Sequence, residues 1–268
     1  MVQFPEAMMF RFLLVATALG ACALPPATGE PLDTAHFSQT GGGTSAAASG
    51  DLELEAEVDI DPSESLSTAV GVVFGLPDRL EVGIAWSPYD VLEQPGPDSR
   101  GSGDVSVAIK KQVLEPSSSQ PGWSIELGTQ LDTSEAGHLE RSGEADLYAA
   151  TALAQSFGAH TWTGYYELVF PDDPDDDSTL VEHVAALQWA TELGAGQVVH
   201  LEGIGTVAPA ADFSATYLGA GLAWAVNEDW TLEVGTLVGL AGESEDFRLL
   251  LGFTTVAARL GRIGSFGL

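Results

Sequence analysis

The chain has 268 residues, a formal net charge of −30 at pH 7 and only 9 Lys and Arg residues. Proteins bind nucleic acid by neutralising phosphates with Lys and Arg, so this composition excludes nucleic acid as a partner. The acidity fits a solvated acidic surface and a functional role equally well. A single cysteine excludes an intrachain disulfide.

Residues 1–22 have the pattern of an export signal. One basic residue, Arg11, precedes a short apolar run and small residues that lead to Cys22. The run is shorter than the about 20 apolar residues that cross a bilayer, so it predicts a signal peptide. Leu19-Gly20-Ala21-Cys22 resembles the bacterial lipobox, which implies lipidation of Cys22. Ordinary signal cleavage after Ala23 is the alternative.

Residues 23–50 contain Pro25-Pro26, Gly41-Gly42-Gly43 and Ala46-Ala47-Ala48 and have no apolar periodicity. This composition predicts a flexible linker. A plug inside a barrel is the alternative.

From Asp51 onward, apolar and polar residues alternate. Five apolar residues between Leu52 and Ile60 alternate with five acids between Asp51 and Asp59, which places the acids on one face of a strand. The alternation continues through Val70 to Phe74 and Leu80 to Trp86. Further strands are expected near 103–114, 122–132, 143–155, 160–170, 179–190, 196–206, 213–226, 230–240 and 246–256.

The connections between these strands differ in length. Short ones are expected at 76–79, 115–121, 156–159, 191–195 and 227–229, and longer or more polar ones at 88–102, 133–142 and 171–178. Short turns at one end and long loops at the other are typical of transmembrane barrels. No segment after the signal is apolar enough for a transmembrane helix, and only helices and closed barrels span membranes. The sequence therefore predicts an all-β, antiparallel, up-and-down transmembrane barrel of about 12 strands over residues 51–268.

Five of the six tryptophans lie beside the expected short turns, on apolar strand faces. They are Trp123, Trp162, Trp189, Trp224 and Trp230. Indole rings favour the headgroup level of a bilayer, so we expect these residues at a membrane interface. The alternative is a set of core aromatics in a soluble sandwich, but such residues have no reason to collect at one end of every hairpin.

Two segments carry a family resemblance. Gly75-Leu-Pro-Asp-Arg-Leu-Glu-Val-Gly83 and, more loosely, residues 225–235 resemble the G-L-T-D-R-L-E-L-G hairpins of Gram-negative outer-membrane barrels. These include the transporter-type barrels grouped with the meta-pathway of phenol degradation. The resemblance implies an outer-membrane location, with outer-membrane lipid and the barrel-assembly machinery as partners. Such barrels usually end on an aromatic residue, whereas here Phe266 is third from the end. The closing strand therefore either lies near 246–256 or includes Phe266.

If the apolar faces meet lipid, the opposite faces line the lumen. The expected lumen residues are Glu53, Glu55, Glu57, Glu81, Glu126, Glu144, Glu167, Glu182, Glu202 and Glu233, together with Asp104 and the cations Lys110 and Arg248. Twelve strands fall between barrels filled by side chains and open porins, so we expect a narrow wet lumen. A carboxylate lining attracts cations and repels anions. A packed lumen closed by loops or by the linker is the alternative.

Other reactive groups are few. The loop Asp172 to Ser178 is rich in acids but lacks the glycine and distal glutamate of an EF-hand, which favours a solvated loop over a calcium site. His183 lies on an outward face without an evident serine partner, and a nucleophile needs a base within reach. No cofactor, metal or enzyme motif is found. We therefore expect no enzyme, but a porin-like or transporter-like barrel that passes small solutes and favours cations. The alternative is a lipid-anchored scaffold barrel whose loops bind a partner.

Overall fold

The computed structural model describes most of the region from residue 43 to residue 260. The described ranges are 43–61, 65–92, 99–117, 119–131, 133, 145–170, 181–209, 212–242 and 247–260. Cys22, Glu144, Phe266 and the loop 171–180 lie outside them, so the predictions made for these residues stay predictions.

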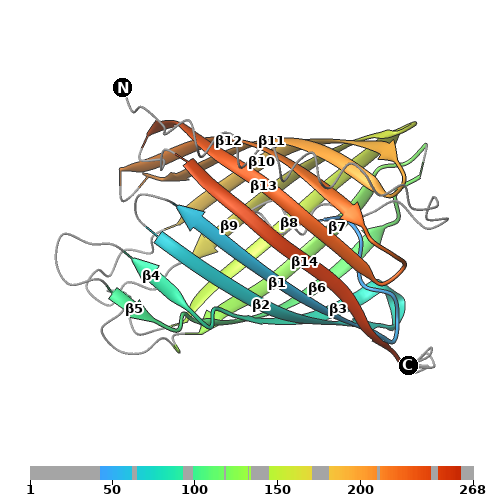
Figure 1. The fold of residues 1–268 in the computed structure, drawn as a ribbon, viewed down its shortest axis with the longest axis horizontal. Helices are drawn as coiled ribbons and strands as arrows, with labels where there is room; N and C mark the ends of the chain where they lie inside the picture. Colours follow the sequence, from blue (N-terminus) through green and yellow to red (C-terminus); the bar gives the residue numbers. More distant parts are fainter. Residues whose placement is uncertain are drawn as a thin grey trace.

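Twelve long strands form a closed antiparallel barrel (Figure 1). In chain order they are β1 (Asp51–Asp61), β2 (Ser65–Leu76), β3 (Leu80–Trp86), β6 (Val105–Leu114), β7 (Gly122–Leu131), β8 (Asp146–Phe157), β9 (His160–Phe170), β10 (Glu182–Gly194), β11 (Gln197–Ala208), β12 (Phe213–Ala225), β13 (Trp230–Gly242) and β14 (Phe247–Arg259). Because β1 pairs with both β2 and β14, the sheet has no open seam. The predicted fold class is confirmed, and the closing strand is the one expected near 246–256.

The loop expected at 88–102 contains two short strands that the sequence did not predict. β4 (Asp90–Leu92) pairs with β5 (Ser99–Gly101) and with the start of β2. Each has three residues, which is too short for an alternating pattern to be recognised. This hairpin extends the sheet beyond the barrel at the end opposite the short turns (Figure 1).

The five connections that the sequence predicted to be short all lie at one end of the barrel, which we call the turn end, although the connections after β1, β11 and β13 at the other end are also short. At the turn end, β2 and β3 are joined by the 3-10 turn η2 (Pro77–Arg79), in which Asp78 and Arg79 both have a φ of 61°. Both chain ends of the barrel meet at the same place, since the Leu260 amide donates to the Gly50 carbonyl at 2.8 Å. The opposite end, which carries β4 and β5, is the loop end (Figure 1).

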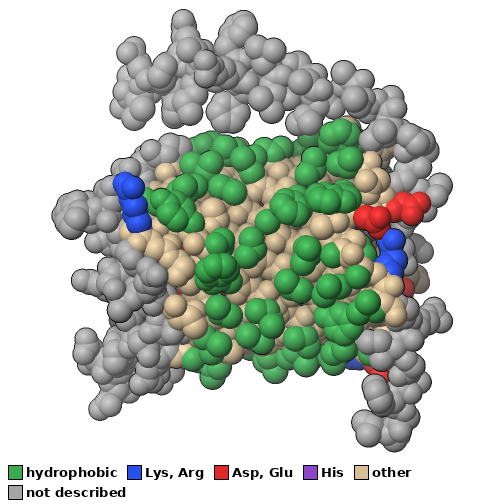
Figure 2. Space-filling model, turned by 60° about the horizontal axis from the view of Figure 1, so that its bottom comes forward, with side chains coloured by type: hydrophobic (Ala, Val, Ile, Leu, Met, Phe, Trp, Pro, Cys, Tyr) green, Lys and Arg blue, Asp and Glu red, His purple; other side chains and the backbone are tan. Residues whose placement is uncertain are grey.

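Polar and apolar side chains are distributed over the two faces of the sheet in the opposite way to a soluble protein. Large apolar side chains are exposed on the outside, such as Leu187 at 55 % and Ile84 at 52 %. Charged side chains are buried on the inside, such as Glu202 at 3 % and Lys110 at 3 % exposed. Figure 2 shows an outer band of hydrophobic and uncharged groups, with charged side chains only near the two ends. This is the surface of a transmembrane barrel, and the soluble-sandwich alternative does not fit it.

No helix among the described residues is long and apolar enough to cross a membrane.

Part of the barrel interior is filled by apolar side chains, whereas the sequence predicted a narrow wet lumen with a packed lumen as the alternative. Ile204, Leu237 and Leu250 form a buried cluster with Tyr217 beside it. A second cluster joins Ala150, Ala152 and Tyr165. Open space lies beside β1, β2, β3, β6 and β7, with Tyr148 of β8 at its edge, and a second space lies between β1, β2, β3 and β14.

Candidate functional site

The predicted interior glutamates lie on strand faces opposite the exposed apolar residues. Glu53, Glu55 and Glu57 of β1 alternate with Leu54, which is exposed. The others that the structure describes occupy the same kind of position on β3, β7, β9, β10, β11 and β13; they are Glu81, Glu126, Glu167, Glu182, Glu202 and Glu233. The barrel therefore brings together carboxylates that are up to 180 residues apart in the chain, as between Glu53 and Glu233.

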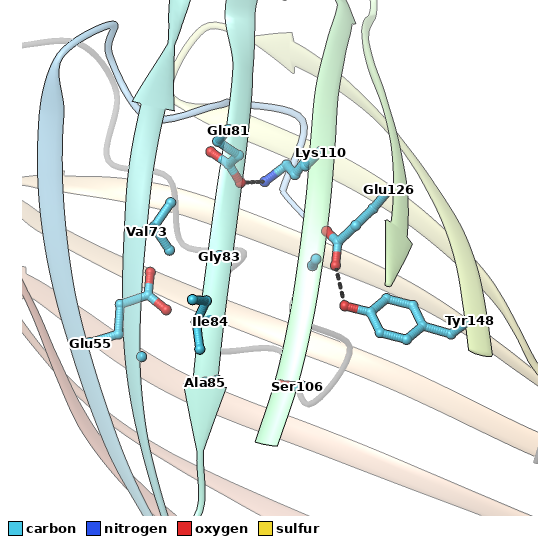
Figure 3. A pocket seen from close by; sticks show the side chains of 12 residues that line it. Glu55, Val73, Glu81, Gly83, Ile84, Ala85, Ser106, Lys110, Glu126 and Tyr148 are labelled. Atoms are coloured by element: carbon cyan, nitrogen blue, oxygen red, sulfur yellow. Dashed lines mark hydrogen bonds and ion pairs between the residues drawn. The ribbon is translucent and has the colours of Figure 1, made fainter. Parts of the chain in front are cut away.

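A cavity of about 150 Å³ lies inside the barrel against β1, β2, β3, β6, β7 and β8 (Figure 3). Its charged and aromatic lining residues are Glu55, Glu81, Lys110, Glu126 and Tyr148. The rest of its lining consists mostly of small residues, namely Gly71, Gly83, Ala85, Ser106 and Ala108. Small interior residues on three neighbouring strands explain why space remains on this side of the barrel.

Glu81 and Lys110 form a buried ion pair at one edge of the cavity. The Lys110 Nζ lies 3.4 Å from the Glu81 Oε1, and the two side chains are 3 % and 9 % exposed. The other carboxylate oxygen of Glu81 accepts a hydrogen bond from the Ala47 amide at 2.6 Å. A buried charge is tolerated only when it is paired and hydrogen-bonded, and Glu81 meets both conditions.

Tyr148 and Glu126 form a second fixed pair across the cavity from Glu55 (Figure 3). The Tyr148 hydroxyl donates to the Glu126 Oε1 at 2.9 Å. The Tyr148 ring also lies directly over Gly128, where an added Cβ would come within 2.3 Å of the ring. Only glycine leaves room for the ring at this position, so the ring has a defined place in the cavity wall.

Residues 43–50 lie inside the turn end of the barrel. The Ser124 hydroxyl donates to the Gly43 carbonyl at 2.9 Å, and the Ala47 amide reaches Glu81. A Cβ on Gly75 would come within 2.0 Å of the Ala48 carbonyl oxygen, and one on Gly122 within 2.8 Å of the Thr44 Oγ1. Close contact with interior groups of β2, β3 and β7 therefore holds this segment beside the cavity.

A separate group of polar residues is buried on the packed side of the barrel. Gln188, His200, Glu202 and Glu233 are all at most 7 % exposed. The His200 ring lies over Gly221, where a Cβ would come within 2.4 Å of it. Nearby on β9, Tyr165 donates a hydrogen bond to Glu167. These contacts occupy interior space along β9 to β13.

Two further interior acids near the loop end, Asp59 and Asp104, are held by an arginine and by amide groups. Arg248 Nη2 lies 3.1 Å from the Asp59 Oδ2. Asp104, another expected interior acid, accepts hydrogen bonds from the Gln130 side chain at 3.0 Å and from the Thr133 amide at 3.1 Å. Among the described residues, no group of three or more His, Cys, Asp and Glu side chains could hold a metal ion.

The structure places the five tryptophans on the outer face at the turn end. Trp162 and Trp189 are direct neighbours across β9 and β10, and Trp189 also stacks on His160 with ring centroids 5.6 Å apart. Trp123, Trp224 and Trp230 lie at the corresponding ends of β7, β12 and β13. Nearer the loop end, the outward His183 and Tyr166 share a hydrogen bond, with 2.7 Å between the His183 Nδ1 and the Tyr166 hydroxyl oxygen. A membrane-interface role for the tryptophans stays a prediction.

Several residues that line the cavity or contact residues 43–50 were not predicted from the sequence. No role was predicted for Tyr148, Gly128 or Ser124, because their contacts depend on which residues are neighbours across the strands. Where two strands are joined by a long connection, the length of the connection does not determine their register. The alternation in β7 and β8 does place Ser124, Gly128 and Tyr148 on interior faces, and this was the available signal.

No protein-family model and no curated protein matches this chain. Among solved structures, the COG4313 outer membrane channel from Pseudomonas putida F1 is similar with a TM-score of 0.62 and 14 % identity, over 80 % of this chain and 98 % of that one. The KdgM and NanC porins each have a TM-score of 0.54, over 76 % of this chain and 98 % of theirs, with 8 % and 11 % identity. This chain has the fold of an outer-membrane β-barrel. At these identities the likeness concerns the fold alone, and the meta-pathway resemblance stays a prediction.

Proposed function

We propose that this barrel is a porin-like channel of the outer membrane that passes small solutes and favours cations. The observation that carries this proposal is the cavity inside a closed barrel, bordered by Glu55, Glu81 and Glu126. The similarity to three solved channels and porins supports a transport role, and we propose no enzymatic one.

The balance of charges on the interior faces supports the preference for cations. Among the described residues, Lys110 and Arg248 are the basic side chains on these faces, and each is within 3.4 Å of a carboxylate. The glutamates outnumber them several times. A carboxylate-lined lumen of this kind concentrates cations and raises the energy of anions.

The same balance argues against a preference for acidic sugars. One related structure is of the KdgM porin with an oligogalacturonate, a polymer that carries a carboxylate on each sugar. A lumen with excess carboxylates repels such a polymer, so the ligand of that porin does not carry over to this chain.

We further propose that residues 43–50 limit the size of the solutes. Their contacts with Glu81, Ser124 and Gly75 lie at the turn end, where a solute would leave the cavity. Export by the residue 1–22 signal, lipidation of Cys22 and insertion by the barrel-assembly machinery belong to the same proposal, with outer-membrane lipid around the apolar band.

Planar-bilayer recording of the purified full chain tests the proposal. We expect stepwise current, with a reversal potential in a KCl gradient that indicates K⁺ over Cl⁻. Replacing Glu53, Glu55 and Glu57 together with Gln should lower this selectivity, because three interior charges are removed. A matched control replaces three exposed acids outside the lumen, Glu115→Gln, Asp212→Asn and Glu228→Gln, and should change the selectivity much less.

Either of two results would contradict the proposal. Absence of stepwise current from correctly folded barrels would exclude a channel. Equal selectivity of the wild type, the interior variant and the control would exclude the carboxylates as its cause.

A further inference from the structure

Gly50 is the residue at which the chain turns from the barrel interior into strand β1. Its amide donates to the Gly75 carbonyl at 2.8 Å, and its carbonyl accepts from the Leu260 amide at 2.8 Å, so Gly50 is bonded both to β2 and to the residue after β14. Its φ of 90° lies in the left-handed region that favours glycine. The Asp51 amide donates to the Ala48 carbonyl at 2.9 Å and closes the turn. Residues 43–49, which we call the strap, therefore leave the sheet at one anchored residue at the turn end (Figure 1).

Among the described residues, two hydrogen bonds attach the strap to the wall beyond this turn. The Ala47 amide donates to the Glu81 Oε2 at 2.6 Å, and the Ser124 hydroxyl donates to the Gly43 carbonyl at 2.9 Å. A hydrogen bond to a carboxylate is stronger than one between two neutral groups. Glu81 therefore supplies the stronger of the two attachments.

Lys110 orients the carboxylate that holds the strap. The Glu81 Oε1 lies 3.4 Å from the Lys110 Nζ, while the Oε2 of the same group accepts from the strap (Figure 3). Lys110 is directly opposite Glu81 across β3 and β6. Both side chains are buried, at 3 % and 9 % exposed, so bulk water does not replace either partner. The ion pair thus fixes which oxygen of Glu81 faces the Ala47 amide.

The strap borders the cavity at the turn end. Glu81 and Lys110 both line the cavity, and Glu81 also contacts the strap. Thr44 of the strap is 5 % exposed and lies beside Gly122 of β7. The contacts of the strap therefore run from β2 past β3 to β7. A solute that leaves the cavity past Glu81 would meet the strap, so the position of the strap affects the width available to it.

We propose that Glu81 determines the size limit of the channel, because it holds the strap in the exit from the cavity and the strap can turn about Gly50. Without the Glu81 contact the strap moves away from the wall as far as Gly50. Gly50 and β1 remain in the sheet through their bonds to β2 and β14. This inference rests on the proposed channel function and adds to it the residue that controls solute size.

Polymer exclusion tests the size limit. Single-channel conductance of the full chain is recorded in KCl with polyethylene glycols of graded mass, since a polymer that enters the lumen lowers the current. We expect Glu81→Ala to admit larger polymers than the wild type, and deletion of residues 43–49 to do the same. Glu81→Ala in the deletion variant should cause no further change, because Glu81 acts through the strap. If Glu81 instead shaped the barrel wall, the substitution would raise the limit in the deletion variant as well.

Hydrogen exchange followed by NMR reports the contact without any current. The Ala47 amide should exchange about tenfold or more faster in Glu81→Ala, because a hydrogen bond to a charged group is lost. Lys110→Met should also speed this exchange, and Glu81→Gln, which keeps an acceptor oxygen, should fall between wild type and Glu81→Ala. The paired amides of β1 should keep their rates, because the strap turns at Gly50. Glu228→Ala is the control, since this acid is exposed in the turn between β12 and β13 and should change neither measurement.

The outcomes distinguish the strap from the channel. Faster exchange at Ala47 together with a larger size limit in Glu81→Ala supports the proposal. Current with the same size limit in the wild type, Glu81→Ala and the deletion variant overturns it and leaves the channel intact. An effect of Glu81→Ala that persists in the deletion variant also overturns it. Absence of current from correctly folded wild type and deletion variant contradicts the channel and with it the size limit, even where exchange at Ala47 shows that Glu81 holds the strap.

Discussion

Glycines decide where the interior of this barrel has room. Gly128 leaves space for the Tyr148 ring, and Gly221 leaves space for His200. Gly75 instead allows the backbone of Ala47 and Ala48 to approach the wall, and Gly122 leaves space for the Thr44 side chain. A glycine in a strand often marks such a close approach. The effect of replacing each one therefore depends on what lies over it, and not on its position in the strand alone.

Gly75→Ala should displace residues 43–50 and increase the conductance. The new Cβ would lie 2.0 Å from the Ala48 carbonyl oxygen, so the backbone of the segment must move away from β2. Single-channel recording measures the change. Gly164→Ala is the matched control, because nothing lies within 4 Å of its Cβ position. An unchanged conductance in Gly75→Ala, with the barrel folded, would show that the segment does not limit the current.

The Glu81 and Lys110 pair should contribute to the stability of the barrel. Removing one member of a buried ion pair leaves the other charge poorly compensated and costs about 3–5 kcal/mol. We expect Glu81→Gln and Lys110→Met each to lower the free energy of unfolding, and the double variant to lower it by less than the sum. A coupling of about 0.5–3 kcal/mol is typical of residues in direct contact. Urea unfolding in lipid bilayers measures all four proteins. Additive effects would indicate that the 3.4 Å contact contributes no stability.

Most strands of the barrel could be predicted from the alternation of polar and apolar residues within each segment. In β1, six acids alternate with five apolar residues, and only a strand separates such a pattern onto two faces. The closing strand β14 was also located, although the position of Phe266 left two alternatives. These predictions succeeded because a strand of 10–13 residues between lipid and interior must alternate over its whole length.

The interior could not be predicted to the same extent. The packing of Ile204, Leu237 and Leu250 depends on how three strands are aligned with one another. The residue pattern of each single strand does not show this alignment. Residues 43–50 have no periodicity, because their contacts are made by backbone groups and not by a repeated side-chain pattern. For this reason the sequence predicted a flexible linker over residues 23–50 and left a plug only as the alternative.

The outer face of β10 allows the membrane depth to be tested within one strand. Leu187 lies mid-strand and Leu193 lies at the irregular end of the strand near the turn end, and they are 55 % and 61 % exposed. An arginine on the lipid face costs about 2–4 kcal/mol at the bilayer midplane and about 0–1 kcal/mol near the interface. Leu187→Arg should therefore lower the free energy of unfolding in bilayers far more than Leu193→Arg. Equal effects would place the membrane elsewhere on the barrel.

The whole molecule separates its polar and apolar groups in the opposite sense to a soluble protein. Its apolar band faces outward, its charged side chains are buried inside, and some of these line a cavity against β1, β2, β3, β6, β7 and β8 (Figures 2 and 3). Apolar clusters occupy part of the interior along β8, β9, β11, β13 and β14. A solute that follows the proposed channel past the cavity would meet the carboxylates of Glu55, Glu81 and Glu126.

The ionic strength should then control the selectivity of the intact barrel. The Debye length is about 10 Å at 0.1 M salt and about 3 Å at 1 M, so carboxylates act across the lumen only in dilute salt. We expect the reversal potential at a fixed ratio of KCl concentrations to indicate strong K⁺ preference near 0.1 M and little near 1 M. The Glu53, Glu55 and Glu57 glutamine variant should show a weaker dependence, because its lumen carries three fewer charges. A preference that stays constant between these concentrations would show that solutes are selected by direct contact or by size, and not by the field of the carboxylates.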